Sequence, residues 1–117
     1  DMLKVNTSLT RLVVNNNQFG ENGVVNCAKA LKINSTLVEI DLRKTTISKA
    51  AASHIIDAFT VNTSLTSIEL SGAWGNYIDE NDFLTIHSLC QRNCQLRKSA
   101  IRKQIVDIVI ALSSLDL

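Results

Sequence analysis

The chain is 117 residues long, with 45% apolar residues, 20% charged residues and a formal net charge of +1. These values are ordinary for one globular domain, and so small a charge gives no overall attraction toward nucleic acid or an anionic membrane. No apolar run reaches the ~20 residues that a membrane-spanning helix needs, and the start lacks a basic-then-apolar signal segment. We therefore expect no nucleic-acid partner and no membrane span.

The opening six residues, DMLKVN, align with KALKIN at 29–34 and with DAFTVN at 57–62. Both later copies end a predicted helix, so the chain opens within the last turn of a helix. A stack of repeats needs a capping repeat with a polar outer face at its end, and no such segment precedes Asn6. We therefore expect the chain to be a fragment of a longer array.

The chain repeats itself from Asn6 onward. Asn6 opens a 28-residue unit, Asn34 opens its second copy and Asn62 its third, while Asn93 begins a degenerate fourth. The first two copies continue as LTRLVVNNNQF and LVEIDLRKTTI, which follow the spacing L-x-x-L-x-L-x-x-N-x-L of the leucine-rich repeat, with Thr45 at the asparagine position of the second copy. The predicted units are 6–33, 34–61 and 62–92.

A repeat of this length, with a short strand followed by a full helix, resembles the leucine-rich repeats of the ribonuclease-inhibitor type over roughly residues 1–96. The resemblance implies an α/β leucine-rich-repeat solenoid, bent into a horseshoe arc. Short parallel strands would line its concave face and helices its convex face. The function has to be argued from a site, because one fold hosts many activities.

Short strands are predicted at Arg11–Val14, Glu39–Leu42 and Ser67–Leu70, side by side in one parallel sheet. Strand side chains alternate between the two faces, so the second and fourth positions of each strand point into the core. A helix is predicted near Gly23–Lys32 from apolar residues spaced three and four apart. The next two repeats have the same stripe.

Asparagine follows each predicted helix, at positions 6, 34, 62 and 93. A left-handed backbone is common there, and asparagine tolerates it best after glycine. The neighbouring Ser and Thr side chains can bond backbone groups of the turn. Asn6, Asn34 and Asn62 also begin glycosylation motifs, but we favour the structural interpretation because nothing in the sequence indicates a secretory route.

The third repeat is three residues longer than the others between Gly72 and Ile78, and this stretch holds the only Trp and the only Tyr of the chain. Trp74 and Tyr77 lie in a predicted loop at the rim of the sheet face. Loops on rigid scaffolds often carry binding, and these residue types are preferred interface anchors. Packing of Trp74 as a plug over its own repeat is an equal alternative.

From about Arg97 the pattern changes to a continuous helix, with Ile101, Ile105, Ile108 and Leu112 on one stripe. Additional apolar residues make this helix apolar on more than one side, which is usual for a buried helix. We expect residues 97–117 to form a C-terminal capping helix over the last repeat, or the joint to a following segment. The final LSSLDL also leaves an irregular further repeat open.

The three cysteines differ in their predicted surroundings. Cys27 and Cys90 occupy core positions of helices, and Cys94 occupies a turn position. This pattern favours free cysteines that act as small apolar residues, in a reducing, cytoplasmic setting. Cys90 and Cys94 have no second ligand pair, so we expect no metal and no cofactor.

The outward strand positions and the rim loop form the candidate surface for a protein partner. Its members are Arg11, Val13, Asn15, Glu39, Asp41, Arg43, Ser67, Glu69, Ser71, Trp74 and Tyr77. Arg11 and Glu39 are adjacent and can pair. Asp41 and Glu69 are like charges on adjacent strands, which destabilises a sheet and hints at a cationic partner. A merely solvated sheet face is the alternative.

A basic cluster lies between Asp82 and Asp107, where the sequence has no acidic residue. The cluster consists of Arg92, Arg97, Lys98, Arg102 and Lys103. It could meet phosphate or an acidic partner. More often, such a cluster is the solvent-facing side of a terminal helix.

These patterns favour non-catalytic protein recognition. His54 and His87 occupy different parts of their helices, and neither stands beside a Ser or Cys in a nucleophile arrangement. Two alternatives belong to other classes. DMLKVN followed by a repeat resembles the C-terminal domain of tropomodulin, an actin-filament cap, and the Ran GTPase-activating proteins share this repeat type, although no residue here matches a functional position of theirs.

Overall fold

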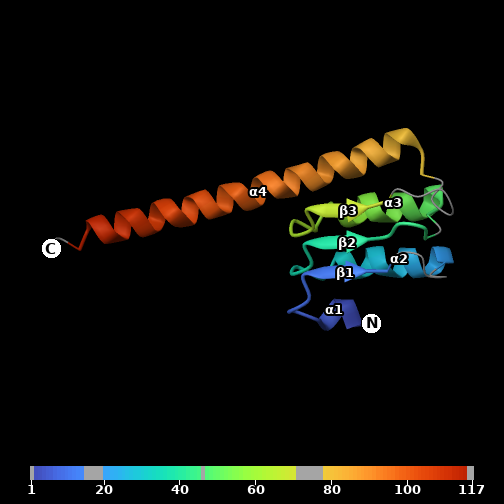
Figure 1. The fold of residues 1–117 in the computed structure, drawn as a ribbon, viewed down its shortest axis with the longest axis horizontal. Helices are drawn as coiled ribbons and strands as arrows, with labels where there is room; N and C mark the ends of the chain where they lie inside the picture. Colours follow the sequence, from blue (N-terminus) through green and yellow to red (C-terminus); the bar gives the residue numbers. More distant parts are fainter. Residues whose placement is uncertain (1, 15–19, 46, 71–77, 116–117) are drawn as a thin grey trace.

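The computed structural model describes residues 2–14, 20–45, 47–70 and 78–115 (Figure 1). Short strands alternate with helices along the chain, and the last helix is much longer than the others. The elements are α1 (Met2–Val5), β1 (Arg11–Val13), α2 (Gly20–Leu31), β2 (Glu39–Asp41), α3 (Lys49–Ala58), β3 (Ser67–Glu69) and α4 (Glu80–Ser113).

The three strands form one parallel sheet in the order β1-β2-β3, as predicted. Leu12 pairs with Ile40 and Ile40 pairs with Ile68, so each pairing joins residues one repeat length apart. Each strand is one residue shorter at its C-terminal end than predicted. The sequence period therefore fixes the register of the sheet directly.

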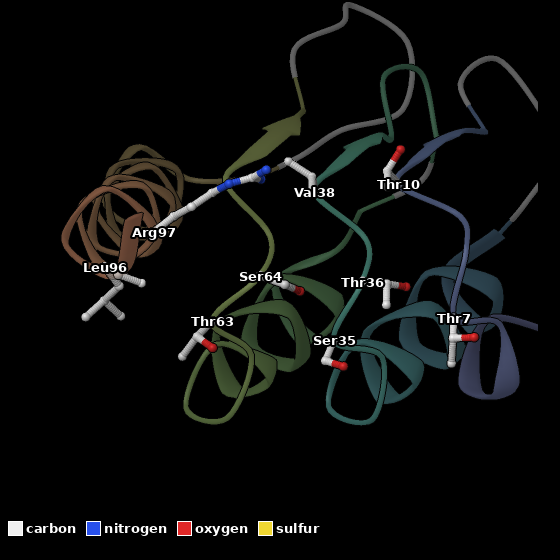
Figure 2. A pocket seen from close by; sticks show the side chains of 10 residues that line it. Thr7, Thr10, Ser35, Thr36, Val38, Thr63, Ser64, Leu96 and Arg97 are labelled. Atoms are coloured by element: carbon white, nitrogen blue, oxygen red, sulfur yellow. The ribbon is translucent and has the colours of Figure 1, made fainter. Parts of the chain in front are cut away.

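The core lies between the sheet and the helices α2 and α3, which cover one face of it (Figures 1 and 2). Ile40, Leu42 and Ile47 from the second repeat are fully buried there. Among the described elements, each helix lies beside its sequence neighbours and each strand beside the adjacent strand. This nearest-neighbour arrangement is that of a repeat protein. With three strands, the horseshoe arc stays a prediction.

The asparagine side chains join neighbouring repeats, and this is why asparagine recurs. The buried Asn34 amide nitrogen donates to the Leu3 oxygen at 2.9 Å and to the Asn6 oxygen at 3.0 Å. Its Oδ1 accepts from the backbone amides two and three residues ahead. Asn62 makes the same four bonds one repeat later. We call this series the asparagine ladder.

The predicted left-handed role of these asparagines is wrong. Among the described non-glycine residues, only Lys44 has a positive φ, at 58°. The positions need asparagine because its amide supplies donors and an acceptor together. Asn34 and Asn62 are each 5% exposed, which also supports the structural interpretation over glycosylation.

The ladder ends differently from the prediction, because α4 runs through Asn93 where a turn was expected. The Asn93 amide still donates to the Asn62 and Leu65 oxygens, at 3.1 and 2.9 Å. Its Oδ1 accepts from the Arg92 guanidinium at 2.8 Å in place of backbone amides. The same guanidinium donates to the Asn62 oxygen at 3.0 Å. Arg92 therefore completes the last step of the ladder.

The first half of α4 covers the last repeat. The cap expected from residues 97–117 is not seen in residues 97–115, and the alternative, a joint to a following segment, stays a prediction. Ile86, Cys90 and Asn93 are the buried residues of this helix, and it contacts α3 and β3. From residue 95 to 115 every side chain is exposed. The chain has no proline and residues 76–117 contain no glycine. Nothing in this sequence therefore stops the helix, and it continues past the repeats (Figure 1). The predicted boundary between residues 96 and 97 falls inside it.

Candidate recognition face

The first row of outward side chains on the sheet runs from Arg11 through Glu39 to Ser67, in register. Arg11 Nε lies 3.1 Å from Glu39 Oε2, and the two side chains are 63% and 38% exposed. This confirms the predicted pair. Because both groups are solvated, the contact adds little to stability and leaves both charges accessible to a partner.

The second row places Asp41 beside Glu69, as the register predicts, but Asp41 is only 3% exposed. Arg43 Nε and Nη2 donate to its two oxygens at 3.0 and 2.8 Å, and the Arg43 backbone amide donates to Oδ1 at 3.0 Å. The inference of a cationic partner from two facing acids is therefore wrong. The chain supplies the compensating cation itself.

The Arg43 hydrogen bonds hold the pKa of Asp41 below its ordinary value of 3.8, while burial acts in the opposite direction. A depressed folded-state pKa means that this pair stabilises the fold above about pH 4 and that its contribution is lost as the pH falls through the folded-state value. The Asp41–Arg43 pair could have been predicted from the sequence. Two residues separated by one position at the end of a strand lie within reach of each other.

Replacing Arg43 with glutamine is expected to raise the pKa of Asp41 and to shift acid unfolding to higher pH, because the buried carboxylate loses its cation. A carbon-detected NMR titration of the Asp41 carboxyl measures the first effect directly. Lys4→Gln, which removes an exposed charge far from Asp41, serves as control. An unchanged Asp41 pKa in Arg43→Gln contradicts this account.

The remaining exposed members of the face are Val13, 47% exposed, Arg43 and Glu69. The apolar Val13 side chain therefore lies on the same face as charged groups of both signs. Four predicted members lie outside the described residues, and their roles stay predictions. These are Asn15, Ser71, Trp74 and Tyr77.

A groove that the sequence did not predict lies at the N-terminal ends of the strands (Figure 2). Its volume is about 720 Å³, and hydroxyl side chains from the turns of all three repeats line it together with Leu96, Arg97 and Ala100 of α4. The Arg97 side chain reaches from α4 toward Val38 (Figure 2). The recurring Ser and Thr residues after each asparagine could have indicated one wall of this groove. The other wall is formed by α4, and the sequence did not show that α4 lies there.

The predicted basic cluster is not one surface. Arg92 turns inward and also donates to the Phe59 oxygen at 2.8 Å, whereas Arg97 lines the groove. The other three members are exposed on the projecting end of α4. The cluster therefore combines one structural arginine with a basic stretch of helix.

The buried cysteines are chemically quiet. Burial raises the pKa of the Cys27 and Cys90 thiols to about 11, so neither is a thiolate at neutral pH. Cys94 is half-buried within α4, not in the predicted turn. His54 and His87 are exposed, and the part of the chain that the structure describes brings no three His, Cys, Asp or Glu residues together as metal ligands.

The repeat geometry agrees with comparisons to known proteins. A family model described as Leucine Rich repeat matches residues 5–26, which include β1 and the first part of α2. The match supports a leucine-rich repeat over these residues. The ribonuclease-inhibitor subtype stays a prediction, and a search of curated proteins finds no match.

Similar solved structures include one titled "Leiomodin-1 Actin-Binding Site 2 (ABS2)", with a TM-score of 0.67 and 18% sequence identity. The match covers 90% of this chain and 76% of the leiomodin chain. It shows that the two share an α/β repeat fold with parallel strands. The matched 90% of this chain is longer than the repeat region, residues 1–96. The match therefore includes part of α4 beyond Leu96. Among the described residues, no helix combines the length and apolar character that a membrane crossing requires.

Proposed function

We propose that this chain is a non-catalytic protein-interaction module that binds a protein partner on the exposed face of its sheet and on the adjoining rim loop. The observation that carries the proposal is the register of the strands. It sets Arg11, Val13, Glu39 and Glu69 in adjacent rows of the sheet, where Val13 on the edge strand β1 is an apolar group among charges of both signs. Leucine-rich repeats are binding modules of this architecture.

The chemistry of the face suits specific recognition more than strong non-specific attraction. Opposite charges lie close together on it, as in the Arg11–Glu39 and Asp41–Arg43 pairs. A partner with the complementary charge pattern gains both steering and register from such a surface. Val13 supplies apolar area that a partner can bury.

The flank of β1 supports the proposal that further repeats extend this face. Leu12 and Val14 are half-buried, whereas Ile40 and Leu42 in the same positions of the next strand are fully buried. A mainly apolar cavity of about 340 Å³ opens there. A further repeat packed on β1 would bury it and lengthen the recognition face. The free cysteines are consistent with a reducing, cytoplasmic setting for such an array.

Val13→Lys is expected to weaken partner binding at least about tenfold without loss of stability, because it places a charge on the exposed apolar group of the proposed face. The matched control is Val61→Lys, since Val61 is 60% exposed and lies in the turn after α3. Quantitative affinity capture from the source cells with the immobilised wild-type chain and both variants measures the effect. A protein retained by wild type and Val61→Lys and lost by Val13→Lys is the expected result. Equal retention by all three contradicts the proposed face.

Two specific partners are tested directly. Co-sedimentation with actin filaments tests the tropomodulin-like alternative. The fold shared with the leiomodin-1 structure is compatible with that alternative. Pelleting of wild type but not of Val13→Lys would identify actin as the partner on this face. A nucleotide-hydrolysis assay with a Ran-type GTPase tests the other alternative.

A further inference from the structure

We propose that the projecting end of α4, residues 95–113, pairs antiparallel with the same segment of a second copy of this chain. We call this segment the tail helix. The inference is independent of the proposed function, because it concerns a different surface from the sheet face.

The tail helix leaves an apolar stripe in solvent. Ile101, Ile105, Ile108 and Leu112 are between 47% and 62% exposed. Contiguous exposed apolar surface of this kind marks an interaction site in a stable protein. Every described side chain from residue 95 to residue 115 is exposed, and the α4 residues that line the groove with the repeat turns are Leu96, Arg97 and Ala100, at the start of the segment.

The stripe continues the face by which α4 packs on the repeats. From Ile86 the series passes through Cys90, Asn93 and Arg97 to Ile101 in steps of three or four residues, which keeps successive side chains on one side of a helix. The first three are buried against the repeats. The stripe therefore continues an established interface along α4, and this part of α4 projects beyond the turns of the repeats (Figure 1).

The spacing of the stripe is self-complementary. Steps of four, three and four residues between Ile101 and Leu112 are those of a two-helix seam. In an antiparallel pair, Ile101 meets Leu112 of the second copy and Ile105 meets Ile108. Every contact is then made twice, as two-fold symmetry requires.

The charges favour this orientation over a parallel one. All four basic residues of the tail helix precede its apolar stretch or lie at its start, and the first acidic residue after them is Asp107. They are Arg97, Lys98, Arg102 and Lys103. Parallel pairing would align these cations with their own copies, whereas antiparallel pairing places them at opposite ends of the seam.

The groove at the root of the tail helix fits the same register. Antiparallel pairing brings Ser113, the last residue of the second helix, opposite Ala100 and one turn away from Arg97. Ala100 and Arg97 line the open groove of about 720 Å³ (Figure 2). The end of the second helix therefore has room against the turns of the repeats, and its C-terminal carbonyls meet the Arg97 cation.

Light scattering coupled to size exclusion tests the pairing, with protein at about 100 μM and at tenfold dilution. The wild-type chain is expected to show twice the monomer mass of 12.9 kDa. Ile108→Asp is expected to run as the monomer. Ile110→Asp, which changes the same residue type on the opposite side of the helix, is expected to remain dimeric. A wild-type monomer at both concentrations overturns the proposal, as does equal loss of the dimer in both variants.

Orientation is tested with a spin label at Ser99→Cys in a Cys94→Ala background, because Cys27 and Cys90 are buried. Antiparallel pairing places residue 99 opposite residue 114, so the two labels lie about 22 Å apart along the helix axis, at 1.5 Å per residue. A label separation of about 10 Å indicates side-by-side parallel helices and overturns the antiparallel register.

Discussion

Ile40→Asp is expected to abolish cooperative unfolding of the chain. Ile40 is 0% exposed and sits in the central strand, paired with Leu12 on one side and Ile68 on the other. An aspartate there must bury an unpaired charge or break the sheet, which costs at least about 5 kcal/mol. That equals much of the total stability of a domain of this size, which is ~5–15 kcal/mol. Thermal unfolding followed by circular dichroism measures the effect.

The control for Ile40→Asp uses the same substitution at an exposed site. Ile33 is 60% exposed in the turn after α2, so Ile33→Asp is expected to shift the unfolding midpoint little. If Ile40→Asp keeps a sigmoidal melt near the wild-type midpoint, Ile40 does not lie between the sheet and the helices, and the repeat register is wrong.

Asn62→Ala is expected to lower the free energy of unfolding by roughly 4 kcal/mol, at about 1 kcal/mol for each of the four hydrogen bonds lost. The Asn62 amide donates to the Leu31 and Asn34 oxygens at 2.8 and 3.0 Å, and its Oδ1 accepts from the Ser64 and Leu65 amides at 3.1 and 2.9 Å. Alanine leaves these backbone groups without partners in a buried turn. Urea unfolding measures the change.

Asn6 offers the matched comparison within the same ladder. It accepts from the Ser8 and Leu9 amides at 2.9 and 2.6 Å, at the solvent-exposed end of the stack. Because water can replace these bonds, Asn6→Ala is expected to cost roughly 1 kcal/mol. Equal costs for Asn6→Ala and Asn62→Ala would show that the links between repeats do not stabilise the stack.

The sheet was predictable because a repeat specifies it many times over. The pairing of Leu12, Ile40 and Ile68 follows from the 28-residue period alone, since equivalent positions of stacked repeats must become neighbours. The helices α2 and α3 follow from the apolar stripe in the same way. Their ends differ from prediction by a few residues, as helix ends usually do.

The asparagine positions were recognised, but their role was not. Asn34 was interpreted through its own backbone preference, whereas its side chain bonds carbonyls 28 and 31 residues earlier. Contacts between repeats cannot be read from one turn considered alone. The same limitation concealed the role of Arg92, which only the position of α4 reveals.

The rows of residues on the candidate face were predictable from the sequence, but the ion pairs among them were not all predictable. Strand alternation placed Asp41 correctly in its row beside Glu69, but it could not show that Arg43 folds back over the carboxylate. The apolar stripe at Ile105 was interpreted as part of a buried helix, whereas its side chains are exposed in the structure. Periodicity could not show this exposure, because it marks a face and not its neighbour.

The central claim is that the three strands stack in parallel, one repeat length apart, to form one recognition face. Inter-strand nuclear Overhauser contacts of the Ile40 backbone test it most directly. Parallel stacking predicts contacts from Ile40 to both Leu12 and Ile68 in the amide-to-α-proton pattern of parallel strands. Strong α-proton to α-proton contacts between strands, which mark antiparallel pairing, or a direct contact of Leu12 with Ile68, would contradict it.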